Sequence, residues 1–89
     1  MVRLFVMHTV DDYDWWREVY DDFDATRAEL GVRSTAVFRA LENPNELTVS
    51  HDFDSAEAAK AFVEDVRLMQ AMESAGVVGT PRIWFAEEA

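Results

Sequence analysis

The first ten residues, MVRLFVMHTV, constrain the fold more than any other stretch of the chain. Read as a β-strand, this segment presents apolar side chains on both faces, because successive side chains alternate. Val2, Leu4, Val6 and Val10 share one face, and Phe5 and Met7 share the other. Such a strand belongs in the interior of a sheet that is covered above and below. The remaining sequence offers only two helical segments, enough for one face, so we expect a second copy of the chain to cover the other.

A chain of 89 residues with 49% hydrophobic residues is expected to form one globular domain, residues 1–89. At this size only about 60–65% of the unfolded surface is buried on folding, so burial between subunits is an effective source of extra stability. The absence of cysteine excludes disulfides, thiolate metal sites and cysteine nucleophiles, and it suits a reducing cytoplasm.

The formal net charge of −10 argues against two classes of partner. Nucleic acid and anionic membrane surfaces require clustered Lys and Arg, whereas this chain has 18 acidic and 8 basic residues. No apolar run approaches the ~20 residues of a membrane span, and no signal-peptide pattern is seen. We therefore expect a soluble cytoplasmic protein that binds neither nucleic acid nor membrane.

Apolar spacing predicts two helices, residues 13–30 and 54–75. Carboxylates before the first and the Asp54–Glu57 segment of the second suit helix N-caps, and each helix ends at a Gly-Val pair. The predicted buried stripe of the first helix is Trp16, Val19, Tyr20, Phe23, Thr26 and Leu30. The predicted stripe of the second is Ala59, Phe62, Val63, Val66, Met69 and Gln70.

Three further strands are predicted at residues 34–41, 46–53 and 82–86. The first two form a hairpin around Glu42-Asn43-Pro44-Asn45. A four-residue loop puts Phe38 opposite Val49 on an apolar face, and a slip of one residue would exchange the two faces. Right-handed crossovers then give a ferredoxin-like α+β fold, βαββαβ, with an antiparallel sheet of order 4-1-3-2 and both helices on one face.

Two histidines, His8 and His51, interrupt apolar strand faces and are the candidate catalytic residues. A buried imidazole needs partners, so each either lines a pocket or is satisfied within the core. In antiparallel neighbouring strands they lie about four residues apart, on the order of 13 Å, too far to share a metal ion. Either one could accept a proton from a phenol or an enolisable carbon.

Large aromatic side chains form the candidate substrate-binding set, with a packed core as the alternative. They are Trp16, Tyr20, Phe23, Phe62 and Trp84, with Phe38 as a further residue that could border a pocket. Tyr20 could donate one hydrogen bond to a ligand, and Met69 and Met72 could either fill gaps in the core or form an adaptable wall of the pocket. Arg39 and Arg82 could anchor an anionic ligand or pair with surface carboxylates.

The acidic cluster Asp11, Asp12 and Asp14 is explained by capping of a helix and needs no ion. It lacks the spacing and the glycine of an EF-hand. No phosphate-binding glycine loop or nucleophile elbow occurs. We therefore predict neither a metal site nor a cofactor.

Three segments, VRLFVMHTVDDYDWW, VFRALENPNELTVSHDFDSAEAAKAF and SAGVVGTPRIWF, resemble the dimeric α/β-barrel superfamily. Within it the chain is similar to small antibiotic-biosynthesis-monooxygenase-like proteins, including cyclase-type members. The marks are a strand followed by His-x-Val-x-Asp-Tyr-Asp-x-Trp at His8–Trp16, and the Asn-Pro-Asn-Glu turn at residues 43–46. The resemblance implies a homodimer with two sheets face to face, and a small-molecule pocket between each sheet and its helices.

Known members of that superfamily include cofactor-independent oxygenases of polyphenolic polyketides, haem-degrading enzymes, lactone isomerases and aldoxime-related enzymes. The haem-degrading branch uses an Asn on the first strand and a His on the second helix, whereas here no Asn precedes Asn43 and no His follows His51. Three hypotheses follow: a cofactor-free oxygenase or cyclase acting on an aromatic metabolite, a non-catalytic binding module, and a purely structural dimerisation unit.

Overall fold

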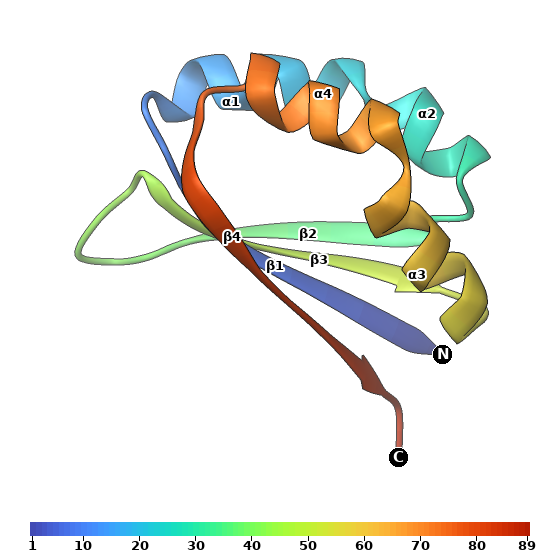
Figure 1. Cartoon of the computed structure of the whole chain (residues 1–89). Coiled ribbons are helices and arrows are strands. Elements are labelled where there is room, and N and C mark those ends of the chain that lie inside the picture. The colour runs from blue at the N-terminus through green and yellow to red at the C-terminus, as the bar shows by residue number, and fades with distance from the viewer.

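The computed structural model describes residues 1–89. Eight elements follow one another: β1 (Val2–Val10), α1 (Tyr13–Asp22), α2 (Asp24–Glu29), β2 (Ser34–Arg39), β3 (Glu46–Phe53), α3 (Ala56–Glu64), α4 (Val66–Ser74) and β4 (Val77–Glu87). The strands form one antiparallel sheet in the order β2-β3-β1-β4, and the helices lie on one face of it (Figure 1). This arrangement confirms the predicted ferredoxin-like topology. None of the helices has the length and apolar content that crossing a bilayer requires.

The central strand β1 places its even-numbered residues toward the helices, as predicted. Val6 lies opposite Val49 of β3 and opposite Ile83 of β4. The β1–β4 register shifts between Met7 and Thr9, and the ladder then continues to the first residue of β4. The last strand is therefore longer than predicted. Pro81 is tolerated within it because β4 is an edge strand.

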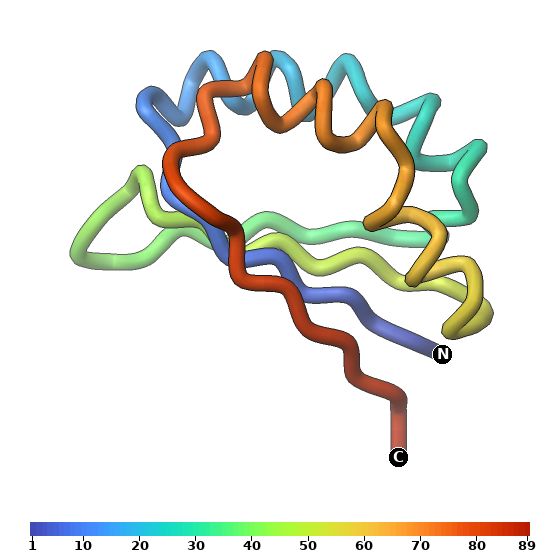
Figure 2. The backbone as a smooth tube through the Cα atoms, in the orientation of Figure 1, coloured from blue at the N-terminus to red at the C-terminus, as the bar shows by residue number.

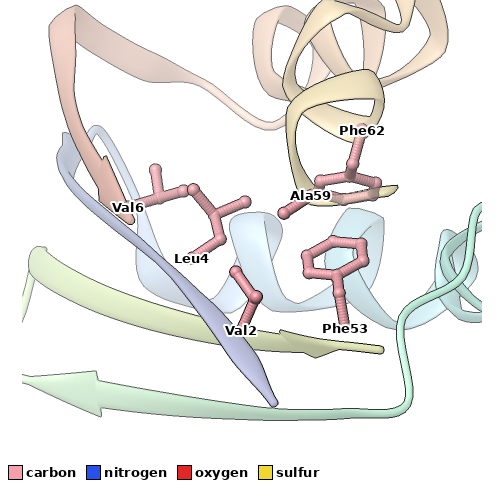
Figure 3. Packing of buried hydrophobic residues seen from close by; sticks show 6 residues of the cluster. All are labelled: Val2, Leu4, Val6, Phe53, Ala59 and Phe62. Atoms are coloured by element: carbon pink, nitrogen blue, oxygen red, sulfur yellow. The ribbon is translucent and has the colours of Figure 1, made fainter. Parts of the chain in front are cut away.

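The hydrophobic core forms in two parts on the helix side of the sheet. In the first part the rings of Phe53 and Phe62 lie 5.5 Å apart, centroid to centroid. Figure 3 shows this part, in which β1, β3 and α3 contribute Val2, Leu4, Val6, Phe53, Ala59 and Phe62. The second part consists of Val10, Trp16, Leu47, Val49 and Ala75. The first part joins β1 and β3 to α3, and the second joins them to α1 and to Ala75, the residue that follows α4.

The first predicted helix, 13–30, is divided at Phe23 into α1 and α2. Its beginning matches the prediction, because the Asp12 carboxylate accepts a hydrogen bond from the backbone N–H of Asp14. Its end matches too: Gly31 has φ +96°, and the N–H of Val32 donates to the carbonyl of Arg27. At Phe23 the backbone tightens, and its N–H is shared between the carbonyls of Val19 and Tyr20.

The second predicted helix is divided at Asp65, where the chain changes direction between α3 and α4 (Figure 2). Asp65 is extended, with φ −72° and ψ 127°, and its carboxylate caps α4 through the N–H of Arg67. This residue shifts the phase of the apolar stripe. Val66, Met69 and Gln70 are exposed, so their predicted burial was wrong. Leu68 and Met72 pack against the core instead.

The β2–β3 hairpin has a register one residue away from the prediction. Val37 lies opposite Val49, and Phe38 lies opposite Thr48. The N–H of Ala40 bonds to the carbonyl of Glu46, so the turn contains five residues rather than four. The slip moves Phe38 to the face of the sheet away from the helices, where it is 60% exposed.

Figure 1 shows that no helix of this chain covers that outer face of the sheet. The face carries apolar side chains. Phe5 of β1 and Trp84 of β4 lie opposite each other, and their rings stack at 5.2 Å. A polar cluster borders them, in which Asp52 accepts hydrogen bonds from the guanidinium of Arg3 and the hydroxyl of Ser34. Arg3 also lowers the pKa of Asp52 below its usual value.

Candidate functional site

A cavity lies between the sheet and the helices, where the two parts of the core meet. One part supplies Val6 and Phe62 to its walls, and the other supplies Trp16, Val49 and Ala75. The cavity has a volume of about 50 Å³, and the whole space between the lining atoms, open solvent included, is about 480 Å³. The cavity itself has room for only a few water molecules, so a ring-bearing ligand would also occupy the solvent-open part of the cleft.

Most of the residues predicted for the site line this cavity. They are His8, His51, Trp16, Tyr20, Phe23 and Phe62. Met72 of α4 also lines it, as one of the two alternatives for that residue suggested.

The two histidines form part of the floor of the cavity. His8 lies opposite Leu47 and His51 opposite Leu4, so the two imidazoles flank the central Val6–Val49 pair. This is the four-residue separation expected from the sequence, on the order of 13 Å along the sheet. Both ring nitrogens of His8 lack a hydrogen-bond partner within the chain, and so does Nδ1 of His51.

Burial keeps both imidazoles neutral. Desolvation lowers the pKa of His8 from 6.5 to about 4. Burial also lowers the pKa of His51 to about 4, with a further contribution from the positive charge of Arg27 and a smaller opposing one from Asp52. A neutral imidazole offers one nitrogen as a hydrogen-bond acceptor and the other as a donor.

Aromatic rings cover the side of the cavity that α1 provides. The rings of Trp16 and Tyr20 are stacked, with centroids 4.8 Å apart, and the ring of His8 lies 5.8 Å from that of Trp16. At the other histidine, the ring of Phe62 lies 5.1 Å from that of His51. Each imidazole therefore packs against an aromatic side chain, and its buried nitrogens make no hydrogen bond within the chain.

A residue that sequence reasoning missed, Arg27, completes the wall. It is only 4% exposed and lines the cavity. Its Cζ lies 3.8 Å from the centroid of the Tyr20 ring, one Nη donates to the carbonyl of Tyr20 at 2.7 Å, and the other lies 3.3 Å from the exposed carboxylate of Asp24. Its Nε has no partner. The signal was present in the sequence, because Arg27 follows Phe23 by four residues and therefore lies on the same helix face.

The buried side-chain polar atoms that lack a hydrogen-bond partner thus all belong to residues that line the cavity. All buried side-chain nitrogens without a partner belong to His8, Arg27 and His51. Leaving a buried polar atom unpaired costs about 1–3 kcal/mol, so such atoms call for an explanation. Neutral bases and a buried cation inside an aromatic cavity can bind a polar group of an apolar ligand or transfer a proton to and from it.

Several predicted site features lie elsewhere. Trp84 is on the outer face of the sheet, stacked on Phe5, and does not line the cavity. The hydroxyl of Tyr20 is already hydrogen-bonded to Thr35, so it is not free to bind a ligand.

The two arginines considered as anion anchors also lie outside the cavity. Arg39 donates to the carbonyl of Pro44 and covers the ring of Tyr13, whereas Arg82 lies over Trp84. Neither of them pairs with a carboxylate.

Sequence comparison and structure comparison give different results for this chain. No family model matches the sequence. No curated protein is similar to it in sequence. Solved structures, in contrast, superimpose over nearly the whole chain.

The first of these comes from Bordetella bronchiseptica and is assigned by name to the antibiotic biosynthesis monooxygenases. It has a TM-score of 0.82 at 11% identity, covering 99% of this chain and 96% of that one. SnoaB, a cofactor-independent oxygenase from Streptomyces nogalater, gives 0.80 at 13% identity, with 99% and 92% covered. A similarly named protein from Deinococcus radiodurans gives 0.72 at 18% identity, with 100% and 93% covered.

The fold and the cavity together define a ferredoxin-like α+β protein with an aromatic-walled cleft between its sheet and its helices. More narrowly, the fold is that of the solved structures named as antibiotic biosynthesis monooxygenases and of SnoaB, as the resemblance found in the sequence implied. At these identities the likeness concerns the fold.

Proposed function

We propose that this protein is a small-molecule-binding homodimer that acts as a cofactor-independent oxygenase on an aromatic, polyketide-like substrate. One observation carries the proposal: two neutral imidazoles without protein partners line an aromatic-walled cavity. The likeness in fold to SnoaB, which is described as a cofactor-independent oxygenase, supports the same reaction type. The absence of cysteine fits a cytoplasmic location.

His8 is the proposed proton acceptor and His51 a polar residue of the pocket. A substrate with an activated CH₂ group between aromatic rings loses a proton from carbon to His8. The resulting carbanion transfers electrons to dioxygen, and a C–O bond forms to give a hydroperoxide. Loss of water then leaves a ketone, so one oxygen atom enters the product and the other enters water. The substrate supplies all the electrons, and no cofactor is needed.

The low pKa of His8 sets a condition on this step. A buried imidazole with a pKa of about 4 is a weak base, so proton transfer to it is favourable only where the new negative charge is stabilised. The proposal therefore requires a substrate whose conjugated rings spread the carbanion charge away from the carbon that loses the proton.

The outer face of the sheet is the proposed dimer interface. Phe5 and Trp84 provide a stacked apolar centre, and Phe38 extends it across β2. A second copy that packs its sheet against this surface would cover all of them and complete a barrel. Covering large apolar side chains in this way contributes about 25 cal/mol per Å² of apolar surface removed from water.

The test uses 1,8-dihydroxyanthrone as a substrate of the proposed class, with product formation and oxygen uptake measured above the uncatalysed background. We expect His8→Ala to reduce the rate by about 10²- to 10⁴-fold, the usual effect of removing a general base. Thr9→Ala, a neighbouring change on an exposed side chain, is the control and should keep the rate. Unchanged turnover in His8→Ala, with dimer and fold intact, would remove His8 from the mechanism.

The second candidate function is binding without chemistry. The low basicity of both imidazoles favours it, since neutral histidines can serve as hydrogen-bond partners of a retained metabolite. Saturable binding of the anthrone to the wild-type protein with no oxygen uptake would support this alternative. The open cleft argues against a purely structural dimerisation unit, whose interior would be filled.

A further inference from the structure

The guanidinium of Arg27 is buried beside the cavity with part of its hydrogen-bonding capacity unused. Its Nε has no partner, and its only charged partner within the chain, Asp24, is 79% exposed at 3.3 Å. Arg remains charged in proteins, so this cation cannot escape the desolvation penalty by losing its proton. A buried charge left in this state is expected to have a partner from outside the chain.

The cavity has two chemically different ends. Along its floor, His8 and His51 are separated by four residues of sheet, on the order of 13 Å. On its helical wall, the ring of Tyr20 lies between the two other side chains, with its centroid 4.8 Å from that of Trp16 and 3.8 Å from Cζ of Arg27. Trp16 touches His8, and the charge of Arg27 acts on His51, so one end pairs an indole with His8 and the other pairs Arg27 with His51.

We propose that Arg27 and His51 form a carboxylate-binding subsite, and that the natural ligand is a flat aromatic acid whose carboxylate lies there while its ring extends toward Trp16 and His8. This inference rests on the proposed function, because it requires the cavity to admit an aromatic ligand. It adds the substrate class and the orientation in which the ligand is bound.

The chemistry of the subsite favours a singly charged, planar anion. The Nε and Nη groups of an arginine form a fork that matches the two oxygens of a carboxylate. A neutral His51 can add one donor. Arg27 is the only cation lining the cavity, so a phosphate dianion would leave a negative charge uncompensated in an apolar site. The stacked rings of Trp16 and Tyr20 complement a flat ligand.

The test compares two probes that have the same shape and differ in charge, 2-naphthoate and 2-naphthamide. Binding is measured by titration calorimetry on the intact protein at neutral pH. We expect the wild-type protein to bind the naphthoate at least tenfold more tightly than the naphthamide, because a charge-assisted hydrogen bond is stronger than a neutral one. Arg27→Met should abolish this preference. Arg39→Met removes the same charge from an arginine outside the cavity and should leave the preference unchanged.

A second measurement needs no variant. The pKa of His51 is followed by NMR of its ring protons in the free protein and with each probe. The charged or titratable groups that act on this imidazole are Arg27, Asp52 and His8, all present in every sample. A carboxylate beside His51 favours the protonated form, so its pKa should rise with naphthoate and not with naphthamide.

The outcomes separate this inference from the proposed function. Equal affinity for the two probes, a preference that survives in Arg27→Met, or an unmoved pKa of His51 overturns the carboxylate subsite but leaves an aromatic-binding cavity. Failure of both probes to bind at millimolar concentration overturns both proposals. If Arg27→Met does not fold, as judged by circular dichroism, the wild-type preference and the His51 titration together decide the question.

Discussion

The imidazole of His8 packs against the indole of Trp16 at 5.8 Å, with an angle of 58° between the ring planes and no hydrogen bond from either imidazole nitrogen. This contact places a titratable group in an apolar setting in the middle of the sheet. The fold therefore stabilises the neutral form of His8, and by the same physical cause the neutral form of His51.

The stability of the protein should fall as the pH falls below about 6.5. The folded-state pKa of both histidines is about 4, below the unfolded value of 6.5. The contribution of the neutral histidines to the free energy of unfolding is therefore complete above pH 6.5. It is lost as the pH drops toward 4, because in this range the unfolded chain binds more protons than the native state does. We expect the free energy of unfolding to decrease by roughly 1 kcal/mol per pH unit for each histidine in this window.

Urea unfolding at a series of pH values between 7 and 4 measures this decrease. Other groups titrate in the same range, so the matched control is the double variant His8→Leu/His51→Leu, in which the histidine contribution is absent. The slope should be smaller in the double variant. Equal slopes in the two proteins would show that the histidines are not buried in the neutral form.

Trp84→Glu should convert the proposed dimer into folded monomers. The indole of Trp84 stacks on Phe5 on the outer sheet face, and a carboxylate there would be buried without a partner in the proposed dimer. We expect the dimer dissociation constant to rise by at least about 100-fold, measured by sedimentation. Val66→Glu adds the same charge to an exposed position on α4 and should leave association unchanged. A wild-type protein that sediments as a monomer at micromolar concentration would refute the dimer itself.

Arg27→Met should change the stability of the protein by no more than about 1 kcal/mol, in either direction. Removing a buried cation eliminates its desolvation penalty, and Met retains much of the apolar packing. The partner carboxylate of Asp24 is exposed and returns to water, and the carbonyl of Tyr20 keeps its bond from Phe23. Thermal unfolding measures the change. A loss of 3 kcal/mol or more would identify Arg27 as a structural residue rather than a binding residue.

Asp65→Ala should destabilise the protein by about 1 kcal/mol, the usual cost of losing an N-cap. The carboxylate of Asp65 accepts from the backbone N–H of Arg67 and starts α4. Glu64→Ala, at the neighbouring last residue of α3, removes a carboxylate that caps no helix and serves as the control. Urea unfolding of the two variants compares them directly, and equal stabilities would contradict the capping role.

The sequence predicted the topology and most of the cavity because both depend on periodicity. Alternation in β1 identified the central strand and placed His8 toward the helices, and helical spacing brought Trp16 and Phe62 to the same space. These patterns are local and survive small errors in the position of an element.

Three features were not predicted, because each depends on a single residue that departs from the regular pattern of its strand or helix. One extra turn residue in the β2–β3 hairpin moved Phe38 to the outer face, and the extended backbone of Asp65 exposed Met69. Arg27 was overlooked because arginine is normally assigned to a solvated face, although its spacing from Phe23 placed it on the apolar one. The proposed binding residue, Arg27, is thus a charged residue at a position where the helix pattern predicts an apolar one.

The separation of α4 from α3 has a consequence for how this protein could acquire new ligands. The nine-residue α4 has no fully buried side chain, yet Leu68, Ala71 and Met72 of this helix line the cavity. Substitutions along α4 can therefore reshape the binding space while β1 and β3 keep the chain folded. Ligand specificity can therefore change during evolution through substitutions in α4, a helix that contributes little to the stability of the fold.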